Sequence, residues 1–299
     1  MAEVSQITDS FRQMVEVRIQ PWFADHYFAG KTILPGVETL LILAGAAKEF
    51  DQQCNVTKMV DVRFDKILQI DPNETTLEMI VEIVTDNPGA ITTKLLTKSR
   101  NNAFSRIMEH GRVTFSILQA TASEAQTERV PIDLAGPIVK VPSAKIYQEL
   151  VPFGQYYQNI VDDLHLSKHG AWARLTAPNL PVSGDDELSW SPFPLDAAFH
   201  AACVWGQRFV GFIPFPVGFA SRIVNRFTKP GRTYETRVLP TEVQPNEIMF
   251  DLWIVDSGGE LCETVRGIRM RDVTGATIKP PTWIMTDECL NDVMPDQSQ

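Results

Sequence analysis

Two stretches of the chain are apolar almost all round, and they predict two buried helices. The first covers residues 37–47, directly after Pro35-Gly36, and the second covers residues 194–205. A helix that is hydrophobic on every side must be covered on every side, so each stretch predicts a central element around which other elements pack. Pro194 suits the first turn of the second helix, where proline is well tolerated.

Between and after these helices, the alternation of apolar and polar residues predicts strands. Turn signals such as Asp86-Asn87-Pro88-Gly89 and Ser257-Gly258-Gly259 separate neighbouring strands. The predicted strands cover residues 57–64, 76–84, 90–99, 106–117, 170–177, 221–228, 233–239, 248–255 and 261–273. One apolar helix followed by successive antiparallel strands indicates a sheet wrapped around that helix, and the chain carries this pattern twice.

The repeated pattern divides the chain into two halves and predicts an α+β fold class. We expect an N-terminal half over residues 1–120, a linker over 121–142, a C-terminal half over 143–286 and a frayed tail over 287–299. The linker begins with polar residues and continues through three prolines, which favours a partly extended path. Ser143 is the expected N-cap of a short helix that runs to Leu150.

A candidate base lies close to the start of the first apolar helix. His26 can accept a proton because imidazole is mostly neutral near pH 7. The buried helix N-terminus, at Gly36, presents backbone N–H groups without intrahelical partners and a partial positive charge. A base and an anion-binding helix end only ten residues apart form half of a candidate active site.

A candidate acid lies in the second apolar helix. Asp196 and His200 are four residues apart, which places them on one helix face within hydrogen-bonding reach. A carboxylate near a helix N-terminus is also favoured as a simple cap, so the position alone leaves a structural interpretation open.

The two candidate regions together resemble the dehydratase domains of polyketide synthases. His26, Gly30 and Pro35 carry the spacing His-x3-Gly-x4-Pro, and Asp196 and His200 carry Asp-x3-His. Single-hotdog fatty-acid dehydratases place their proline one residue nearer the histidine. The resemblance implies a double hotdog, with two antiparallel sheets each wrapped around a central apolar helix. The resemblance favours a catalytic role for Asp196 over a role as a helix cap.

Two weaker segments extend the resemblance across most of the chain. Residues 151–158 look like a degraded form of the family's Gly-Tyr-x-Tyr-Gly-Pro-x-Phe-Gln, in which Val151 and Phe153 replace the tyrosines. Tyr156 or Tyr157 could take over from those tyrosines or could simply pack. Residues 213–216, which include Phe215, resemble the family's Leu-Pro-Phe-Ser.

The resemblance implies a dehydratase that acts on 3-hydroxyacyl thioesters bound to an acyl carrier protein. His26 would take the α-proton, and Asp196, kept protonated by an apolar pocket, would protonate the departing β-hydroxyl. The backbone N–H of Gly36 would stabilise the enolate-like oxygen. His200 would orient the acid, and Gly30 would allow a tight turn that aims the base.

The remaining expectations concern substrate contacts, cofactors and partners. Pro35 leads into the first helix, and the expected substrate contacts are Leu34, Tyr157 and Phe215. We expect no cofactor, because both bonds break by proton transfer, and the phosphopantetheine arm of the carrier protein presents the substrate. The expected partners are the acyl carrier protein and other synthase domains, with a homodimer as an option.

Two alternative functions stay open. One is a product-template-like cyclase, which uses a similar pair of His and Asp residues on the same fold. The other is a non-catalytic double hotdog that binds acyl chains or scaffolds a synthase. The presence of both His26 and Asp196 counts against an idle domain.

Composition limits the binding partners that the chain is expected to have. The net charge of −10 is dispersed along the chain, which argues against nonspecific binding of nucleic acid. Four basic residues could form a local basic patch or a solvated strand face: Arg222, Arg226, Lys229 and Arg232. No apolar stretch reaches transmembrane length, so we expect no membrane association.

Cysteine and histidine usage fits a cytoplasmic protein without a metal. The four cysteines lack Cys-x2-Cys spacing, which indicates reduced, packed thiols, and the first residues contain no signal core. His165 and His169 are four residues apart but have no third ligand at a suitable spacing.

Overall fold

The computed structural model describes residues 9–85, 89–101, 104–116, 130–131, 134–180 and 190–286. The chain divides into two compact units. The first unit comprises Met1–Glu128 and Gly218–Val224, and the second comprises Arg129–Val217 and Asn225–Gln299. Residues 121–129 of the predicted linker and the whole predicted tail, 287–299, lie outside the described residues.

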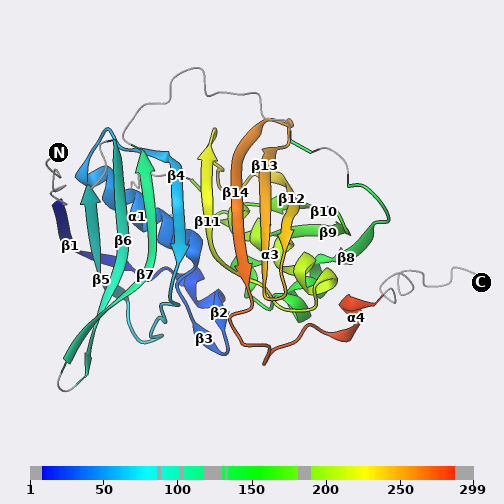
Figure 1. Ribbon diagram of the computed structural model, residues 1–299, viewed down its shortest axis with the longest axis horizontal. Coiled ribbons are helices and arrows are strands. Elements are labelled where there is room, and N and C mark those ends of the chain that lie inside the picture. Colours follow the sequence, from blue (N-terminus) through cyan, green and yellow to red (C-terminus); the bar gives the residue numbers. More distant parts are fainter. Residues whose placement is uncertain are drawn as a thin grey trace, which may run out of the picture. The chain divides into compact units, whose positions relative to one another are not determined.

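The first unit is an antiparallel sheet packed against helix α1 (Gly36–Phe50) (Figure 1). Its strand order is β1-β5-β6-β7-β4-β11. The strands are β1 (Asp9–Arg18), β4 (Asn55–Phe64), β5 (Thr76–Thr85), β6 (Ala90–Asn101), β7 (Phe104–Ser116) and the Gly218–Val224 part of β11 (Phe215–Val224). The sequence pattern assigned residues 218–224 to the C-terminal half. Strand pairing instead joins them to the first unit, with Ser221 opposite Val60 of β4.

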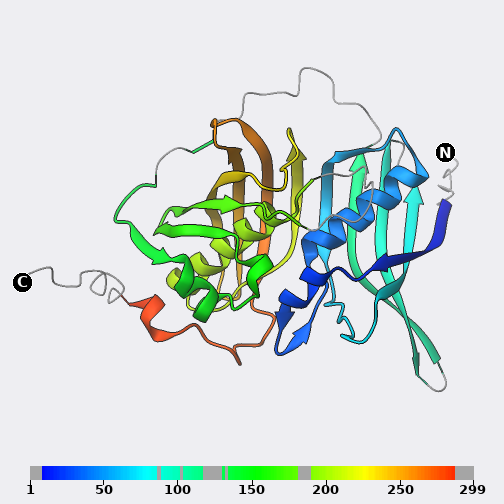
Figure 2. The ribbon, with the colours of Figure 1, turned by 180° about the vertical axis from the view of Figure 1, so that it is seen from behind.

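Strand and helix periodicities together place the core of the first unit between α1 and its sheet. On β5, Met79 and Val81 are buried, whereas Glu78 and Ile80 on the opposite face are exposed and half-buried, as expected when alternate side chains point to opposite faces. Leu43 and Ala44 of α1 are fully buried, and α1 contacts β4, β5, β6 and β7. Figure 2 shows the helix lying across one face of these strands. Ile42 is only half-buried, so α1 is covered on most sides rather than on all.

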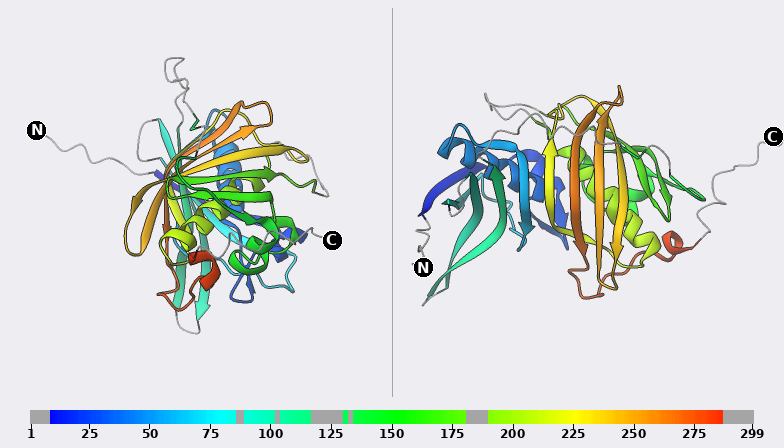
Figure 3. Two further views of the ribbon diagram at one scale, coloured as in Figure 1. Left: turned by 90° about the vertical axis from the view of Figure 1, so that its right-hand side faces the viewer. Right: turned by 45° about the horizontal axis from the view of Figure 1, so that its top comes forward.

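The second unit repeats the plan around helix α3 (Phe193–Phe209). Its strand order is β14-β13-β12-β10-β9-β8. The strands are β8 (Val139–Pro142), β9 (Ile160–Ser167), β10 (Gly170–Thr176), β12 (Thr233–Val243), β13 (Glu247–Asp256) and β14 (Leu261–Arg271). Every residue of α3 from Phe193 to Gln207 is buried, and the strands arch over the helix (Figure 3). The predicted sheet around a central apolar helix is confirmed in both units.

The structure differs from the sequence prediction at several strands and at one helix start. The strands β1, β8 and β9 were not predicted. β8 falls within the predicted linker, yet Lys140 pairs opposite His165 of β9, so this end of the linker belongs to the second sheet. The expected cap at Ser143 is wrong, because Pro142 is the N-cap of α2 (Ser143–Lys145) and no side chain caps it.

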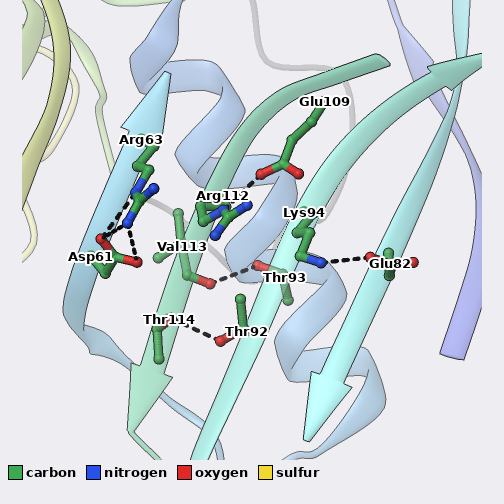
Figure 4. Close-up of polar contacts among 10 residues, drawn as sticks. All are labelled: Asp61, Arg63, Glu82, Thr92, Thr93, Lys94, Glu109, Arg112, Val113 and Thr114. Carbon is green, nitrogen blue, oxygen red and sulfur yellow. Dashed lines mark hydrogen bonds and ion pairs between the residues drawn. The ribbon is translucent and has the colours of Figure 1, made fainter. Parts of the chain in front are cut away.

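Polar pairs link neighbouring strands of the first sheet (Figure 4). Glu82 of β5 accepts hydrogen bonds from Lys94 of β6 at 2.8 Å and from Arg12 of β1 at 2.7 Å. Burial alone raises the pKa of Glu82, but the hydrogen bonds from the two cations outweigh it and hold this pKa below its ordinary value. One carboxylate therefore ties three adjacent strands together.

Truncation of a core residue on α1 tests the packing of the first unit. We expect Leu43→Ala to lower the free energy of unfolding by about 2–5 kcal/mol, because it removes fully buried methyl groups and leaves a cavity. The adjacent Ile42→Ala is the matched control and should cost clearly less, since Ile42 is half-buried. Urea denaturation followed by circular dichroism measures both. Equal losses in the two variants would contradict the proposed orientation of α1.

The Glu82 network predicts a pH dependence of stability. A carboxyl whose pKa is lower in the folded state contributes stability that is present above its unfolded pKa, near about 4.3, and is lost as the pH falls through the folded value. The difference in unfolding free energy between wild type and Glu82→Gln should therefore shrink as the pH falls from about 6 to about 3. Glu78→Gln, an exposed position on the same strand, should show little such dependence. Denaturant titrations across this range measure it, and a constant difference would contradict the assignment.

Candidate active site

His26 is held by its backbone and by one ring nitrogen. It follows the 3₁₀ helix η1 (Pro21–Asp25) and is 8% exposed. Its backbone N–H donates to the carbonyl of Phe23 at 3.0 Å, and its carbonyl accepts the N–H of Ile33 at 3.0 Å. Its Nδ1 lies 3.2 Å from the carbonyl oxygen of Ile33. Because a carbonyl only accepts, Nδ1 carries the proton and Nε2 keeps its lone pair in the neutral ring. That lone pair suits a general base.

A tight hairpin connects His26 to the residue that fixes its ring. The strands β2 (Tyr27–Phe28) and β3 (Lys31–Thr32) are joined by Ala29 and Gly30, with φ angles of 49° and 75°. Two successive positive φ angles are the requirement of a type I′ turn. A Cβ on Gly30 would meet no atom within 4 Å. Glycine is therefore preferred there because of the positive φ angle and not because of a lack of space. Gly30 lies in the tight turn that the sequence predicts.

The start of α1 lies shortly after the hairpin in the chain. Pro35 is the N-cap, no side chain caps the helix, and Gly36 is the first helical residue. The first N–H groups of a helix have no intrahelical acceptors, so they remain available as donors. The ring of Phe64 would lie 3.1 Å from a Cβ on Gly36. Glycine therefore allows an aromatic side chain to pack directly against the helix start.

The first turn of α1 also carries a buried carboxylate that the sequence analysis did not select. Glu38 is 8% exposed and accepts a hydrogen bond from Nε1 of Trp22 at 3.1 Å. A carboxylate in this position interacts favourably with the positive end of the helix dipole. It reduces the positive potential near Gly36, so an oxyanion there would depend on direct N–H donation. A single acid inside the apolar run 37–47 was the signal that could have identified it.

Asp196 and His200 form a buried pair on α3. Asp196 is 6% exposed and His200 is 5% exposed. Nε2 of His200 lies 3.0 Å from Oδ2 of Asp196, as their spacing predicts. The two atoms approach off the N–H axis, so this is a close polar contact rather than a straight hydrogen bond. Because both residues lie on one helix, their separation is set by helix geometry.

A tyrosine missed at the sequence level contacts the other side of the His200 ring. Tyr147 lies in the π-helical turn η3 (Ile146–Leu150), and its hydroxyl is 3.5 Å from Nδ1 of His200. The same hydroxyl oxygen accepts the backbone N–H of Ile160 at 2.7 Å. Nothing in the local sequence pattern links Tyr147 to His200, because 53 positions separate them.

Aromatic packing surrounds this part of the second unit. Phe153, which stands where the related motif has a tyrosine, packs against the His200 ring with centroids 5.2 Å apart. Tyr157 is fully buried between Phe153 and Phe193, at 6.3 Å and 5.2 Å. Phe215 is half-buried at the start of β11. In the first unit Leu34 is 7% exposed. Substrate contacts by Tyr157, Phe215 and Leu34 stay predictions.

The structure corrects the candidate basic patch and characterises the thiols. Arg222 is 3% exposed, so the prediction that it lines a basic surface is wrong. Arg226 is paired with Glu260 at 3.4 Å. Burial raises the pKa of the Cys203 thiol to about 12, so this cysteine is a poor nucleophile. His165 stacks on Trp172 with centroids 4.6 Å apart.

The described ranges lack two features. They contain no group of three or more His, Cys, Asp or Glu side chains arranged to hold a metal ion. Within the same ranges, no helix combines the length and the apolarity needed to cross a membrane.

Two units of one chain, each with antiparallel strands packed around one central helix, define a double hotdog protein. Family comparisons narrow this class. The family described as "polyketide synthase dehydratase N-terminal domain" matches residues 125–277, and that described as "polyketide synthase dehydratase domain" matches residues 2–96. The chain belongs to the polyketide synthase dehydratase family. No curated protein sequence matches it.

Solved structures share the fold. A trans-AT polyketide synthase dehydratase domain from Brevibacillus brevis is 16% identical, with a TM-score of 0.68 over 88% of this chain and 93% of that chain. An inactive CurJ dehydratase, in which Phe replaces a His, is 18% identical in complex with a compound, with a TM-score of 0.61 over 91% and 93%. The dehydratase domain of PpsC from Mycobacterium tuberculosis, in complex with C12:1-CoA, is 18% identical, with a TM-score of 0.61 over 87% of this chain and 93% of that chain. These structural similarities establish the fold that the chain shares with these domains.

The hairpin geometry predicts the tautomer of His26. We expect ¹⁵N NMR of the histidine rings to show His26 protonated at Nδ1, and Gly30→Ala to produce a mixture of tautomers, because the strained turn loosens the contact with Ile33. Gly259→Ala is the control. Gly259 also has a positive φ, of 81°, and open space around a Cβ, but it lies between β13 and β14. An unchanged His26 tautomer in Gly30→Ala would contradict a role for this turn in holding the ring.

Proposed function

We propose that this chain dehydrates 3-hydroxyacyl thioesters carried on the phosphopantetheine arm of an acyl carrier protein. In this proposal His26 is the base and Asp196 is the acid. Membership of the dehydratase family supports the reaction type. Two relatives support the chemistry: PpsC binds an acyl-CoA, and the CurJ variant in which Phe replaces a His is described as inactive.

The observation that carries the proposal is how the two motif residues are anchored. Nδ1 of His26 contacts the carbonyl of Ile33, so the proton-accepting lone pair is on Nε2. Oδ2 of Asp196 faces His200, so Oδ1 is the oxygen that would serve the substrate. Each side chain thus has one atom held by a neighbour, and the proposal assigns proton transfer to the other atom.

The proposed elimination balances with two proton transfers. Nε2 of His26 takes the α-proton, and the C–H bonding pair forms an enolate-like carbanion whose oxygen is stabilised by the N–H of Gly36. The β-carbon–oxygen bond then breaks as Oδ1 of Asp196 delivers its proton, which releases water and leaves the 2-enoyl thioester. His26 finishes protonated and Asp196 finishes ionised, so a net proton returns from one to the other before the next turnover.

The same proposal specifies partners and requirements. An acyl carrier protein delivers the substrate, and other synthase domains supply the 3-hydroxyacyl chain and consume the enoyl product. Because both steps are proton transfers, the proposed reaction needs no cofactor. Homodimerisation is compatible with the proposal and is not required by it.

Mass spectrometry of carrier-bound substrates tests the reaction type. A panel of 3-hydroxyacyl thioesters that varies in chain length and configuration should lose one water per turnover. Ring closure without the enoyl product would instead indicate a cyclase, and an unchanged substrate mass would indicate a binding module. Either of those outcomes would overturn the proposed dehydration.

Substitution of the proposed acid and base tests the assignment. His26→Ala and Asp196→Asn should each lower the dehydration rate by roughly 10²–10⁴, the usual contribution of a positioned acid or base. The double variant should be little worse than either single variant, because residues that act on one step are not additive. His200→Ala should cost clearly less, since His200 only orients the acid.

A second buried histidine provides a matched control for His26. His110 is 5% exposed, and its ring contacts Thr97 at 2.7 Å and the carbonyl of Lys66 at 3.0 Å. His110→Ala should therefore lower stability while folded protein keeps its dehydration rate. If folded Asp196→Asn retains near-native dehydration, Asp196 is not the acid.

A further inference from the structure

His200 has polar neighbours at both ring nitrogens, and only one of them belongs to a recognised motif. Nε2 faces Oδ2 of Asp196 at 3.0 Å, and Nδ1 faces the hydroxyl of Tyr147 at 3.5 Å. The Tyr147 side chain is buried, with 7% exposed, and its ring meets that of His200 edge-on with centroids 5.8 Å apart. The two neighbours together can decide which nitrogen of the neutral ring carries the proton.

The hydrogen bond from Ile160 sets the direction of the Tyr147 hydroxyl. A backbone N–H can only donate, so the 2.7 Å contact makes the Tyr147 oxygen an acceptor toward Ile160. The hydroxyl proton must then point elsewhere, and Nδ1 of His200 is the nitrogen it faces. Burial raises the pKa of Tyr147, so the phenol keeps the proton that it donates.

We propose that Tyr147 is a positioning residue that fixes His200 in the tautomer with its proton on Nε2. Nδ1 accepts from Tyr147, so Nε2 carries the ring proton and lies 3.0 Å from Oδ2 of Asp196, which it approaches off the N–H axis. This inference rests on the proposed function in one respect, which is that Asp196 is the proton donor. It adds a residue outside the dehydratase motifs and a defined protonation state for the pair.

The tautomer determines which oxygen of Asp196 holds the acid proton. With a protonated Nε2 3.0 Å from Oδ2, the positive end of the N–H dipole favours Oδ2 as the unprotonated oxygen of the carboxyl group and places the O–H on Oδ1. When the Oδ1–H bond breaks, the electron pair stays on the carboxylate, and the same N–H stabilises the new anion. In the opposite tautomer, the Nε2 lone pair would face Oδ2 and would compete with the substrate for the proton.

Tyr147→Phe tests this assignment, because it removes one hydroxyl and keeps the ring. We expect kcat to fall roughly tenfold, about the net worth of one hydrogen bond, with KM changed by less than about twofold. Tyr234→Phe is the matched control. Tyr234 is a buried tyrosine whose oxygen accepts the N–H of Lys229 at 2.6 Å, and its loss should affect stability rather than kcat.

A double-mutant cycle separates tautomer control from simple packing. His200→Gln keeps an N–H donor for Asp196, but its amide has no tautomers, so the donor no longer depends on Tyr147. Tyr147→Phe should therefore cost less than about twofold in the His200→Gln background. An equal tenfold loss in both backgrounds would mean that Tyr147 acts elsewhere, and the proposal would be wrong.

Ring ¹⁵N NMR reads the tautomer without any turnover. The chain has 5 histidines, and the signals that vanish in His200→Gln identify His200. Wild type should show His200 protonated at Nε2, and Tyr147→Phe should show a mixture. An unchanged tautomer overturns the proposal even if the rate falls, and a changed tautomer with an unchanged rate overturns its catalytic part. Because the spectrum is independent of dehydration, a failure of Asp196 as the acid remains distinguishable from a failure of this inference.

Discussion

Enclosure of an apolar helix by an antiparallel sheet is the constraint on which the rest of each unit depends. α3 is buried from Phe193 to Gln207, so any polar side chain within it must find partners inside the protein. Asp196 and His200 make a close polar contact with each other at 3.0 Å, and the Tyr147 hydroxyl faces the other ring nitrogen of His200 from a separate turn. The water-poor surroundings also strengthen the electrostatic effect of each N–H and O–H group. The apolar core that stabilises the second unit thus also surrounds Asp196, His200 and Tyr147.

The two candidate groups are held by different kinds of structure. His26 lies between a short 3₁₀ helix and a hairpin with a two-residue turn, and the backbone carbonyl of Ile33 contacts its ring. Asp196 and His200 lie on the α-helix Phe193–Phe209, which its own backbone hydrogen bonds and its buried surroundings hold in place. The base thus depends on turn chemistry at Ala29 and Gly30, whereas the acid depends on burial of α3.

Features set by local periodicity could be predicted from the sequence, and features set by distant pairing could not. The helices α1 and α3 were predicted because their apolar runs are long, and the Asp196–His200 contact was predicted because helix spacing alone produces it. Tyr147 was missed because its contact with His200 depends on how η3 packs in the folded unit. Residues 218–224 were assigned to the wrong half, because their pairing with β4 joins strands far apart in the chain. Arg222 was expected at the surface for the same reason.

The position of the acid and its neighbour on one continuous helix limits how the chain can change in length. Each residue of an α-helix advances the side-chain direction by about 100°, so one inserted residue between Asp196 and His200 would turn them onto different faces. A rotation of the helix could not restore the contact, because the surrounding strands pack against α3 and fix its orientation. Insertions and deletions in this lineage should therefore gather in the connections between strands and leave the interval from Phe193 to Phe209 at constant length.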